Sequence, residues 1–283
     1  MSRAAAAVLA VVLLTAMHAV AAWTYFPDAD GLRLTHDAFG WIASIAAVAG
    51  TLLGVAAFAK GDHLRRVWSL LAAGAAFLLV GTALRSVWTH VAPGASFVDS
   101  PLIIPRFVAV TAANVCATWA LILLATTYRR SGLRPEPSTG AVALWIAVSV
   151  VAVLLGARQL SMDAGKLSGV ASTFSALTNM ASTVADTVTI ILIVPILRTA
   201  FLLRGGRLAW AWWALGLSGA VWLVYDGREF LAAACPSSTL ALELLRTLRT
   251  PGLALMGLAG FLQSEALREP EPAVQVPPAP AAP

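Results

Sequence analysis

Residues 184–230 contain the feature that most constrains this chain, two apolar runs that are each long enough to cross a lipid bilayer. Arg-Gly-Gly-Arg joins the runs; its glycines permit a tight turn, and its arginines prefer water and lipid phosphate. The pattern predicts a hairpin of two transmembrane helices. Asp186 lies 19 residues before the first of these glycines, and Asp226 lies 20 residues after the second. At ~1.5 Å of rise per residue, both carboxyl groups are expected roughly 28–30 Å from the turn, near the opposite membrane face.

The composition extends this prediction to the whole chain. Of its 283 residues, 59% are hydrophobic and 12% are charged, which is about half the charged share of soluble domains. This length accommodates about eight membrane spans with short loops and leaves no room for a large soluble domain. The net charge of +5 comes from arginines near helix ends rather than from a basic run, so nucleic acid is not an expected partner.

We therefore predict an all-α, polytopic membrane helix bundle over residues 1–268. Apolar runs place its first five spans at about residues 4–23, 41–58, 67–88, 107–128 and 141–160, and the hairpin supplies the sixth and seventh. The eighth is expected within residues 239–266, where Pro251 should kink it. Residues 269–283 are proline-rich and are expected to form a disordered cytoplasmic tail. An Ala-Val-Ala sequence at residues 19–21 leaves open that the first run is a cleaved signal peptide.

Basic residues set the expected orientation, because lysine and arginine favour the cytoplasmic side of a membrane. They follow the second, fourth and sixth predicted spans, and Arg3 and Arg268 fall on the same side. Both termini are therefore expected in the cytoplasm. The resulting prediction is a multi-pass protein of the bacterial inner membrane, whose surrounding partner is the lipid bilayer.

Ionisable residues from distant parts of the sequence are expected at one height near the outer face. Counting helical rise puts them roughly 22–30 Å from the inner face. The layer comprises Arg85, Arg106, Arg158, Asp186, Asp226, Arg246 and Arg249, with Glu229 and Glu243 near it. In the sixth span, polar residues at three- and four-residue steps include Asn179 and lead to Asp186, which predicts one polar helix face.

Three interpretations of this layer remain open from the sequence alone. Its arginines and aspartates could pair and tie helices together, could reach lipid headgroups, or could line an outward-facing pocket. Such a pocket would favour a small anion or a lipid headgroup, since guanidinium binds carboxylate and phosphate through paired hydrogen bonds. The candidate ligand-binding residues are Arg85, Arg158, Asn179, Asp186, Asp226 and Arg246.

Motifs for catalysis, metals and cofactors give no support to an enzyme. Gly216–Gly219 resembles the G-x-S-G form of rhomboid-type serine proteases, but no histidine follows it to act as the base. The histidines at 18, 36 and 90 lack metal-ligand spacing, and no lysine in a late helix suits a retinal Schiff base. We therefore favour a non-enzymatic protein without a cofactor or a metal.

The segment RGGRLAWAWWALGLSGAVWLVYD, which follows an apolar helix with a proline, resembles the multi-helix input modules of bacterial membrane sensor proteins. This resemblance covers the sixth and seventh predicted spans and implies a module that senses a small ligand or the membrane state. Such modules are usually joined to a kinase or cyclase domain, whereas a proline-rich segment follows Arg268 here. A sensor role therefore implies a separate signalling partner. The alternatives are a transporter, a lipid-handling membrane enzyme, or an accessory subunit of a membrane complex.

Overall fold

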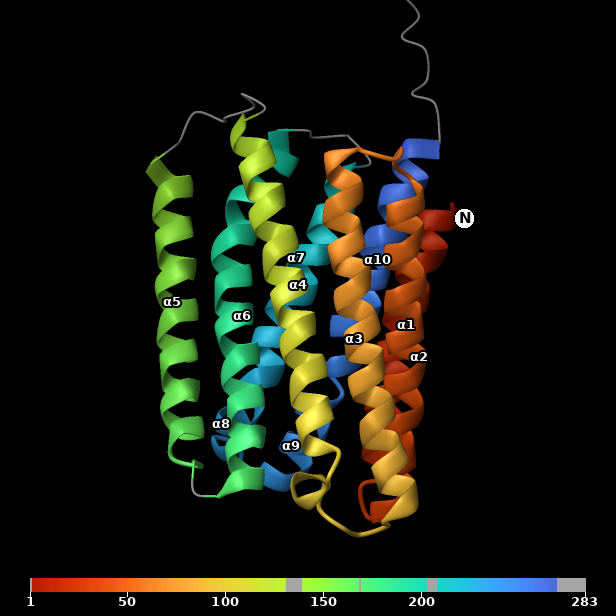
Figure 1. Cartoon of the computed structure of the whole chain (residues 1–283), viewed down its shortest axis with the longest axis vertical. Coiled ribbons are helices and arrows are strands. Elements are labelled where there is room, and N and C mark those ends of the chain that lie inside the picture. Colours follow the sequence, from red (N-terminus) through yellow and green to blue (C-terminus); the bar gives the residue numbers. More distant parts are fainter. Residues whose placement is uncertain (1, 131–138, 168, 203–207, 269–283) are drawn as a thin grey trace, which may run out of the picture.

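A computed structural model describes residues 2–130, 139–167, 169–202 and 208–268, and within these ranges it contains helices but no β-strand. In this described part, eight long helices run side by side as one bundle (Figure 1). They are α1 (Arg3–Thr24), α2 (Ala29–Ala56), α3 (His63–Val91), α4 (Ile103–Arg130), α5 (Thr139–Ala164), α6 (Val170–Leu202), α7 (Leu208–Asp226) and α10 (Arg249–Arg268). The short helices are η1 (Phe97–Asp99), α8 (Arg228–Ala233) and α9 (Ser238–Arg246).

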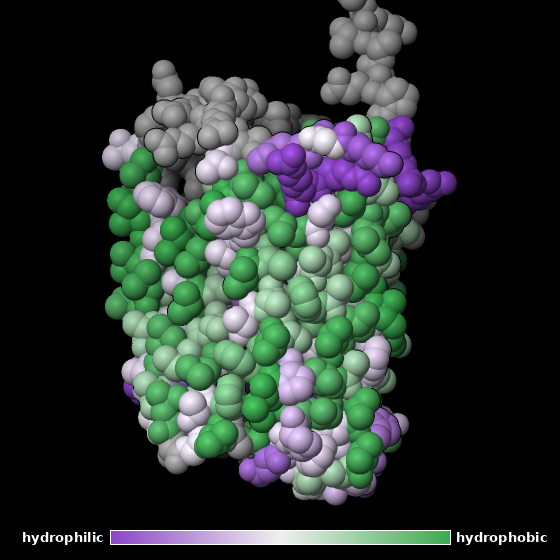
Figure 2. Space-filling view, viewed as in Figure 1, coloured by the Kyte–Doolittle hydropathy of each residue, from purple (hydrophilic) through white to green (hydrophobic). Residues whose placement is uncertain are grey.

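Seven of the long helices, α1 to α7, are long and apolar enough to cross a membrane. Figure 2 shows hydrophobic residues over most of the side of the bundle, with a strongly hydrophilic patch at one end. These features indicate a multi-pass membrane protein and confirm the all-α prediction. The count of eight spans and the cytoplasmic termini stay predictions. The Arg-Gly-Gly-Arg turn and the tail at residues 269–283 lie outside the described residues.

The two ends of the described chain lie at the same end of the bundle. Figure 1 shows the start of α1 and the end of α10 close to one level. Arg3 Nη1 lies 3.9 Å from Glu265 Oε1, so the first and last long helices lie close together there. An arrangement of this kind is the one expected for an even number of crossings.

α10 lies inside the bundle rather than at its surface. Fourteen of its 20 residues are buried, and it packs most extensively against α2 and α7, with α1 along a third side. A helix surrounded by protein does not need lipid-facing apolar side chains. This explains why α10 is absent from the seven apolar spans, although it is long enough to be one.

Glycines bring the backbones of α2 and α10 into direct contact. A methyl group added at Gly257 would overlap the carbonyl oxygen of Ala46, and one added at Gly50 would overlap the carbonyl oxygen of Gly257. Close approach through small residues is a common way for helices to associate in lipid, where burying apolar side chains between helices gains little. Glycine at these positions therefore determines how near the two helices lie.

The predicted eighth span is not one kinked helix, so that prediction is wrong. α9 ends at Arg246 and α10 begins at Arg249. Pro251 lies in the first turn of α10, where its missing N–H needs no partner and its fixed φ suits a helix start. The break leaves Arg246 and Arg249 at the ends of two different helices.

α2 begins well before its apolar run. Its first residue is Ala29, whereas the hydrophobic pattern predicts a start near Trp41. Asp28 caps the helix, and its carboxylate accepts a hydrogen bond of 3.1 Å from the backbone N–H of Asp30. The added turns carry three charged residues among the first nine, so hydrophobicity does not reveal them. As a result His36, which falls between the first two predicted spans, lies on a helix.

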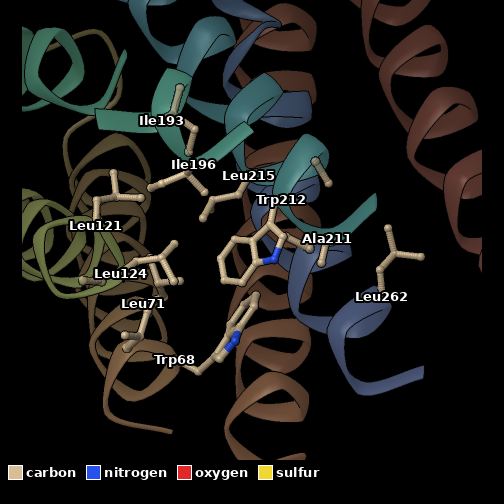
Figure 3. Close-up of a cluster of buried hydrophobic side chains, with 14 of the residues drawn as sticks. Trp68, Leu71, Leu121, Leu124, Ile193, Ile196, Ala211, Trp212, Leu215 and Leu262 are labelled. Atoms are coloured by element: carbon tan, nitrogen blue, oxygen red, sulfur yellow. The ribbon is translucent and has the colours of Figure 1, made fainter. Parts of the chain in front are cut away.

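Buried apolar side chains close one end of the bundle, and we call them the apolar cluster (Figure 3). The cluster includes Trp68, Leu71, Leu121, Leu124, Ile193, Ile196, Trp212, Leu215 and Leu262. The rings of Trp68 and Trp212 lie at its centre, 6.1 Å apart, and both residues are buried. Because α3, α4, α6, α7 and α10 all contribute, the cluster binds the interior of the bundle together at this end.

Lys166 ties α8 to the connection between α5 and α6 at the other end. Its ammonium group donates hydrogen bonds to Glu229 at 2.8 Å and to Asp163 at 3.4 Å. The hydrogen bond from Lys166 lowers the pKa of Glu229 below its ordinary value of 4.5. The bridge therefore contributes stability above about pH 4.5, and this contribution is lost as the pH falls through the lowered pKa.

We expect Glu229→Gln to lower the free energy of unfolding by under ~1 kcal/mol at pH 7, because both partners are about two-fifths exposed. The difference from the wild type should shrink as the pH falls through the lowered pKa of Glu229. Thermal melts of both proteins at pH 7 and pH 3 measure the effect. A difference of the same size at both pH values would contradict this account.

Candidate functional site

Two adjoining recesses with polar linings lie on the side of the apolar cluster that faces α8 and α9. The central cavity, of about 130 Å³, lies among α3, α4, α6, α7 and α10, and Leu71, Leu121 and Leu215 of the apolar cluster line its deep end. The histidine recess, of about 160 Å³, also receives residues from α1, α2 and α9. Both recesses share a set of lining residues, so they lie next to each other. The shared residues are Tyr225, Arg228 and Arg249.

Five arginines from five different helices line these recesses, and we call them the arginine cluster. They are Arg85 on α3, Arg106 on α4, Arg228 on α8, Arg246 on α9 and Arg249 on α10. All except Arg246 lie close enough together for mutual electrostatic repulsion, and all four are only partly exposed. Because arginine stays charged in proteins, the cluster concentrates positive charge at this end of the bundle.

Few carboxylates neutralise the arginine cluster. Arg246 pairs with Glu243, but no ion pair joins any of the other four arginines to a carboxylate among the described residues. Guanidinium groups that are partly removed from water and placed beside one another are costly when they lack a counter-charge. In the part of the chain that the structure describes, the four arginines therefore lack a direct ion-pair partner, although Asp226 lies near Arg228 and Asp37 lies near Arg249.

Neutral groups hold the arginines in place instead. Arg249 donates a hydrogen bond to the hydroxyl oxygen of Thr82. Arg228 donates to the backbone carbonyl of Tyr225 at 2.9 Å, and its guanidinium carbon lies 4.3 Å from the centre of the Tyr225 ring. Arg106 lies 5.5 Å from the centre of the Phe97 ring. These contacts orient the guanidinium groups without cancelling their charge.

Asp186 and Asp226 meet at the central cavity, as the arithmetic of the hairpin predicts. Both line the cavity, and their carboxyl groups lie close enough to interact. Asp226 Oδ2 is buried without a hydrogen-bond partner in the described part of the chain. Asn179 and Ser182 continue the polar face of α6 along the cavity, and Ser182 accepts a hydrogen bond of 3.0 Å from the Asn114 amide of α4.

Most of the predicted ligand-binding residues come together in these recesses. Asn179, Asp186 and Asp226 line the central cavity, and Arg85 and Arg246 line the histidine recess. Arg158 is the exception, because it is exposed and lines a different cavity of about 160 Å³ with Gln159, Thr183 and Asp226. The structure shows no ion pair from Arg85 or Arg158 to either aspartate within the described ranges.

Other lining residues were not among the predicted candidates. Arg106 and Arg249 belong to the predicted polar layer, and their shared height was the signal that could have selected them. Tyr225 and Arg228 were missed altogether, because they flank Asp226-Gly227 at the boundary between an apolar run and a loop. α7 ends at Asp226 and α8 begins at Arg228, which lines both recesses.

A chain of hydrogen bonds crosses the histidine recess and joins α1, α2, α9 and α10. His18 Nδ1 lies 2.8 Å from Thr250 Oγ1, and His18 Nε2 lies 3.0 Å from His36 Nδ1. His36 Nε2 lies 3.1 Å from Glu243 Oε2, and the other carboxylate oxygen of Glu243 accepts from Arg246. His18 is 2% exposed, so the chain begins in the interior of the protein.

Comparison with known proteins identifies no relative: no protein family, curated protein or solved structure matches this chain. The functional interpretation therefore rests on the residues that line the two recesses.

Proposed function

We propose that this chain is a multi-pass membrane protein that binds a small anion, or the anionic headgroup of a lipid, within the arginine cluster. The supporting observation is that four arginines from four helices meet without a carboxylate ion pair among the described residues. A bound oxyanion would supply the missing counter-charge and accept paired hydrogen bonds from the guanidinium groups. The excess of arginine favours a ligand with at least two negative charges.

The size and lining of the central cavity restrict the ligand further. About 130 Å³ suits an ion of phosphate or small dicarboxylate size and is well below the volume that a drug-sized ligand occupies. The arginines lie at one end of the cavity, and Leu71, Leu121 and Leu215 lie at the other. An anionic group with a short apolar extension therefore fits the chemistry along the cavity.

The apolar cluster favours a binding or sensing module over a transporter. It fills the bundle beyond the deep end of the central cavity with buried side chains such as Trp68 and Trp212. A transporter needs a second opening on that side, and the apolar cluster provides no polar route to one. With the predicted topology, the recesses face outward from a bacterial inner membrane. A bound ligand would then act on a separate signalling partner through the helices that it bridges.

Binding to the purified protein tests this proposal. In detergent, sulfate, inorganic phosphate and succinate are compared with chloride at constant ionic strength by thermal shift. In nanodiscs, phosphatidylglycerol is compared with phosphatidylcholine, which separates a lipid headgroup from a free anion. We expect at least one dianion or phosphatidylglycerol to raise the melting temperature by several degrees, in line with mass action on the folded state.

Two substitutions locate the binding site. Arg249→Gln should remove the stabilisation, because Arg249 lines both recesses. Arg158→Met is the matched control and should retain it, because Arg158 is exposed and lines a different cavity. If neither the dianions nor phosphatidylglycerol stabilises the wild type, the proposed function is wrong.

A further inference from the structure

Glu243 determines which groups donate and which accept along the hydrogen-bond chain in the histidine recess. An ionised carboxylate can only accept, so His36 Nε2 carries a hydrogen and donates to Glu243. Nδ1 of a neutral His36 is then an acceptor, so His18 Nε2 donates to it. His18 Nδ1 is left to accept from the hydroxyl of Thr250. Every atom in the chain is therefore satisfied when both imidazoles are neutral.

Glu243 keeps this role over the pH range in which histidine usually titrates. Burial raises the pKa of Glu243, but hydrogen bonds from His36 and Arg246 outweigh burial, and the pKa lies below its ordinary value of 4.5. The carboxylate consequently stays ionised between pH ~5.5 and pH ~8, the range in which imidazoles commonly change charge. Glu243 therefore remains the hydrogen-bond acceptor at its end of the hydrogen-bond chain throughout this range.

The same chain can hold one more proton without losing a hydrogen bond. A proton added to His36 Nδ1 points at His18 Nε2, which then becomes the acceptor. The hydrogen of His18 moves to Nδ1 and is donated to Thr250 Oγ1 or to the nearby backbone carbonyl of Thr247. The pair thus has two fully hydrogen-bonded states that differ by one positive charge.

Charges around the pair decide which of these states is favoured. The groups that face it or lie beside it are Arg85 on α3, Tyr225 on α7, Arg228 on α8, Glu243 and Arg246 on α9, Arg249 on α10, and Asp37 on α2 beside Arg249. The arginines outnumber the two carboxylates, so the neutral state is favoured when no anion is present. An anion among the arginines reverses the local balance and favours the protonated state.

We infer that the His18–His36 pair is a proton-binding site coupled to the arginine cluster, so that the protein takes up a proton when it binds an anion. This inference rests on the proposed function. Because binding linkage is reciprocal, the anion must bind more tightly when the pair is protonated. The affinity for the anion is therefore expected to rise as the pH falls.

Calorimetric titration with sulfate tests the coupling, because sulfate keeps both of its charges over this pH range. For the wild type we expect affinity to rise about tenfold from pH 8.0 to pH 5.5, within the usual range for coupled sites. Titrations near pH 6.5 in buffers of different ionisation enthalpy should show net uptake of a fraction of a proton per sulfate. Equal affinities at both pH values without proton uptake would overturn the coupling and leave the anion site standing. Absence of sulfate binding at both pH values counts against the free-anion site as well.

Substitution of single histidines locates the proton. His36→Gln should flatten the ratio of affinities between the two pH values to under about twofold, because glutamine does not titrate. The controls are His63→Gln and His90→Gln, since neither residue lines the recess and each is bonded to a backbone carbonyl elsewhere. Both controls should keep the tenfold ratio. A tenfold ratio in His36→Gln would overturn the assignment. Proton uptake is measured on the wild type, so it tests the coupling even if a variant fails to fold.

Discussion

Replacing Gly257 with alanine is expected to lower the free energy of unfolding by about 3 kcal/mol. The added methyl group would overlap the carbonyl oxygen of Ala46 on α2. A backbone carbonyl in a helix cannot turn aside, so α2 and α10 would have to separate along their contact. The separation would loosen the most extensive helix pair of the bundle. Equilibrium unfolding of the purified protein in mixed micelles of increasing dodecyl sulfate content measures the change in the free energy of unfolding.

Gly140→Ala is the matched control for this substitution. A methyl group at Gly140 meets no atom within 4 Å, and alanine favours a helix over glycine by about 1 kcal/mol. We therefore expect the control to be at least as stable as the wild type. If Gly257→Ala also unfolds at the wild-type midpoint, α2 and α10 do not touch through their backbones.

Arg106→Met is expected to change ligand binding and stability in opposite directions. Arg106 lies at the central cavity beside Arg85, Arg228 and Arg249, and its partner is the ring of Phe97 rather than a carboxylate. Methionine removes a repelling charge and keeps apolar volume, so the ligand-free protein should gain about 1 kcal/mol of stability. The loss of a charged donor should weaken binding of a dianion about 10- to 100-fold. Unfolding without ligand and calorimetric titration with sulfate measure the two effects.

Arg33→Met is a control whose stability should change in the other direction. Arg33 pairs with Asp30 at 3.1 Å and donates to the backbone carbonyl of Thr89 at 3.0 Å, so its loss removes satisfied contacts. We expect a slightly less stable protein with unchanged affinity for sulfate. Should ligand-free Arg106→Met instead prove less stable than the wild type, Arg106 has a structural role. The observation that supports the proposed function would then be lost.

Hydropathy predicted the parts of the fold that face lipid and missed the parts that pack on protein. The runs that became α1 and α3 to α5 lie close to the helices observed, because a lipid-facing helix must be apolar along most of its length. The first turns of α2 carry charged residues, and α10 is enclosed by other helices, so hydropathy does not locate the start of either helix. The break between Arg246 and Arg249 depends on packing and on Pro251, which counting residues along one helix does not capture.

Counting helical rise predicted the height of the candidate residues but not the direction in which they point. Asp186 and Asp226 share both height and direction, so they meet. Arg158 lies in the same predicted layer, yet it is exposed, whereas the next residue, Gln159, is buried. One residue along an α-helix turns the side chain by about 100°, so a single step separates an inward from an outward position. Only the packing of α5 on α6 determines which of the two faces inward.

The enclosed position of α10 also bears on biogenesis. Membrane insertion selects segments by hydrophobicity, and α10 falls short where α1 to α7 do not. We therefore expect α10 to enter the membrane by packing against α2, α7 and α1, with its closest approach at Gly50 of α2. Docking of α10 would then complete the interior of the bundle and place Arg249 at both recesses in one step. Nascent chains that lack α10 would reach the membrane without Arg249, which lines both recesses.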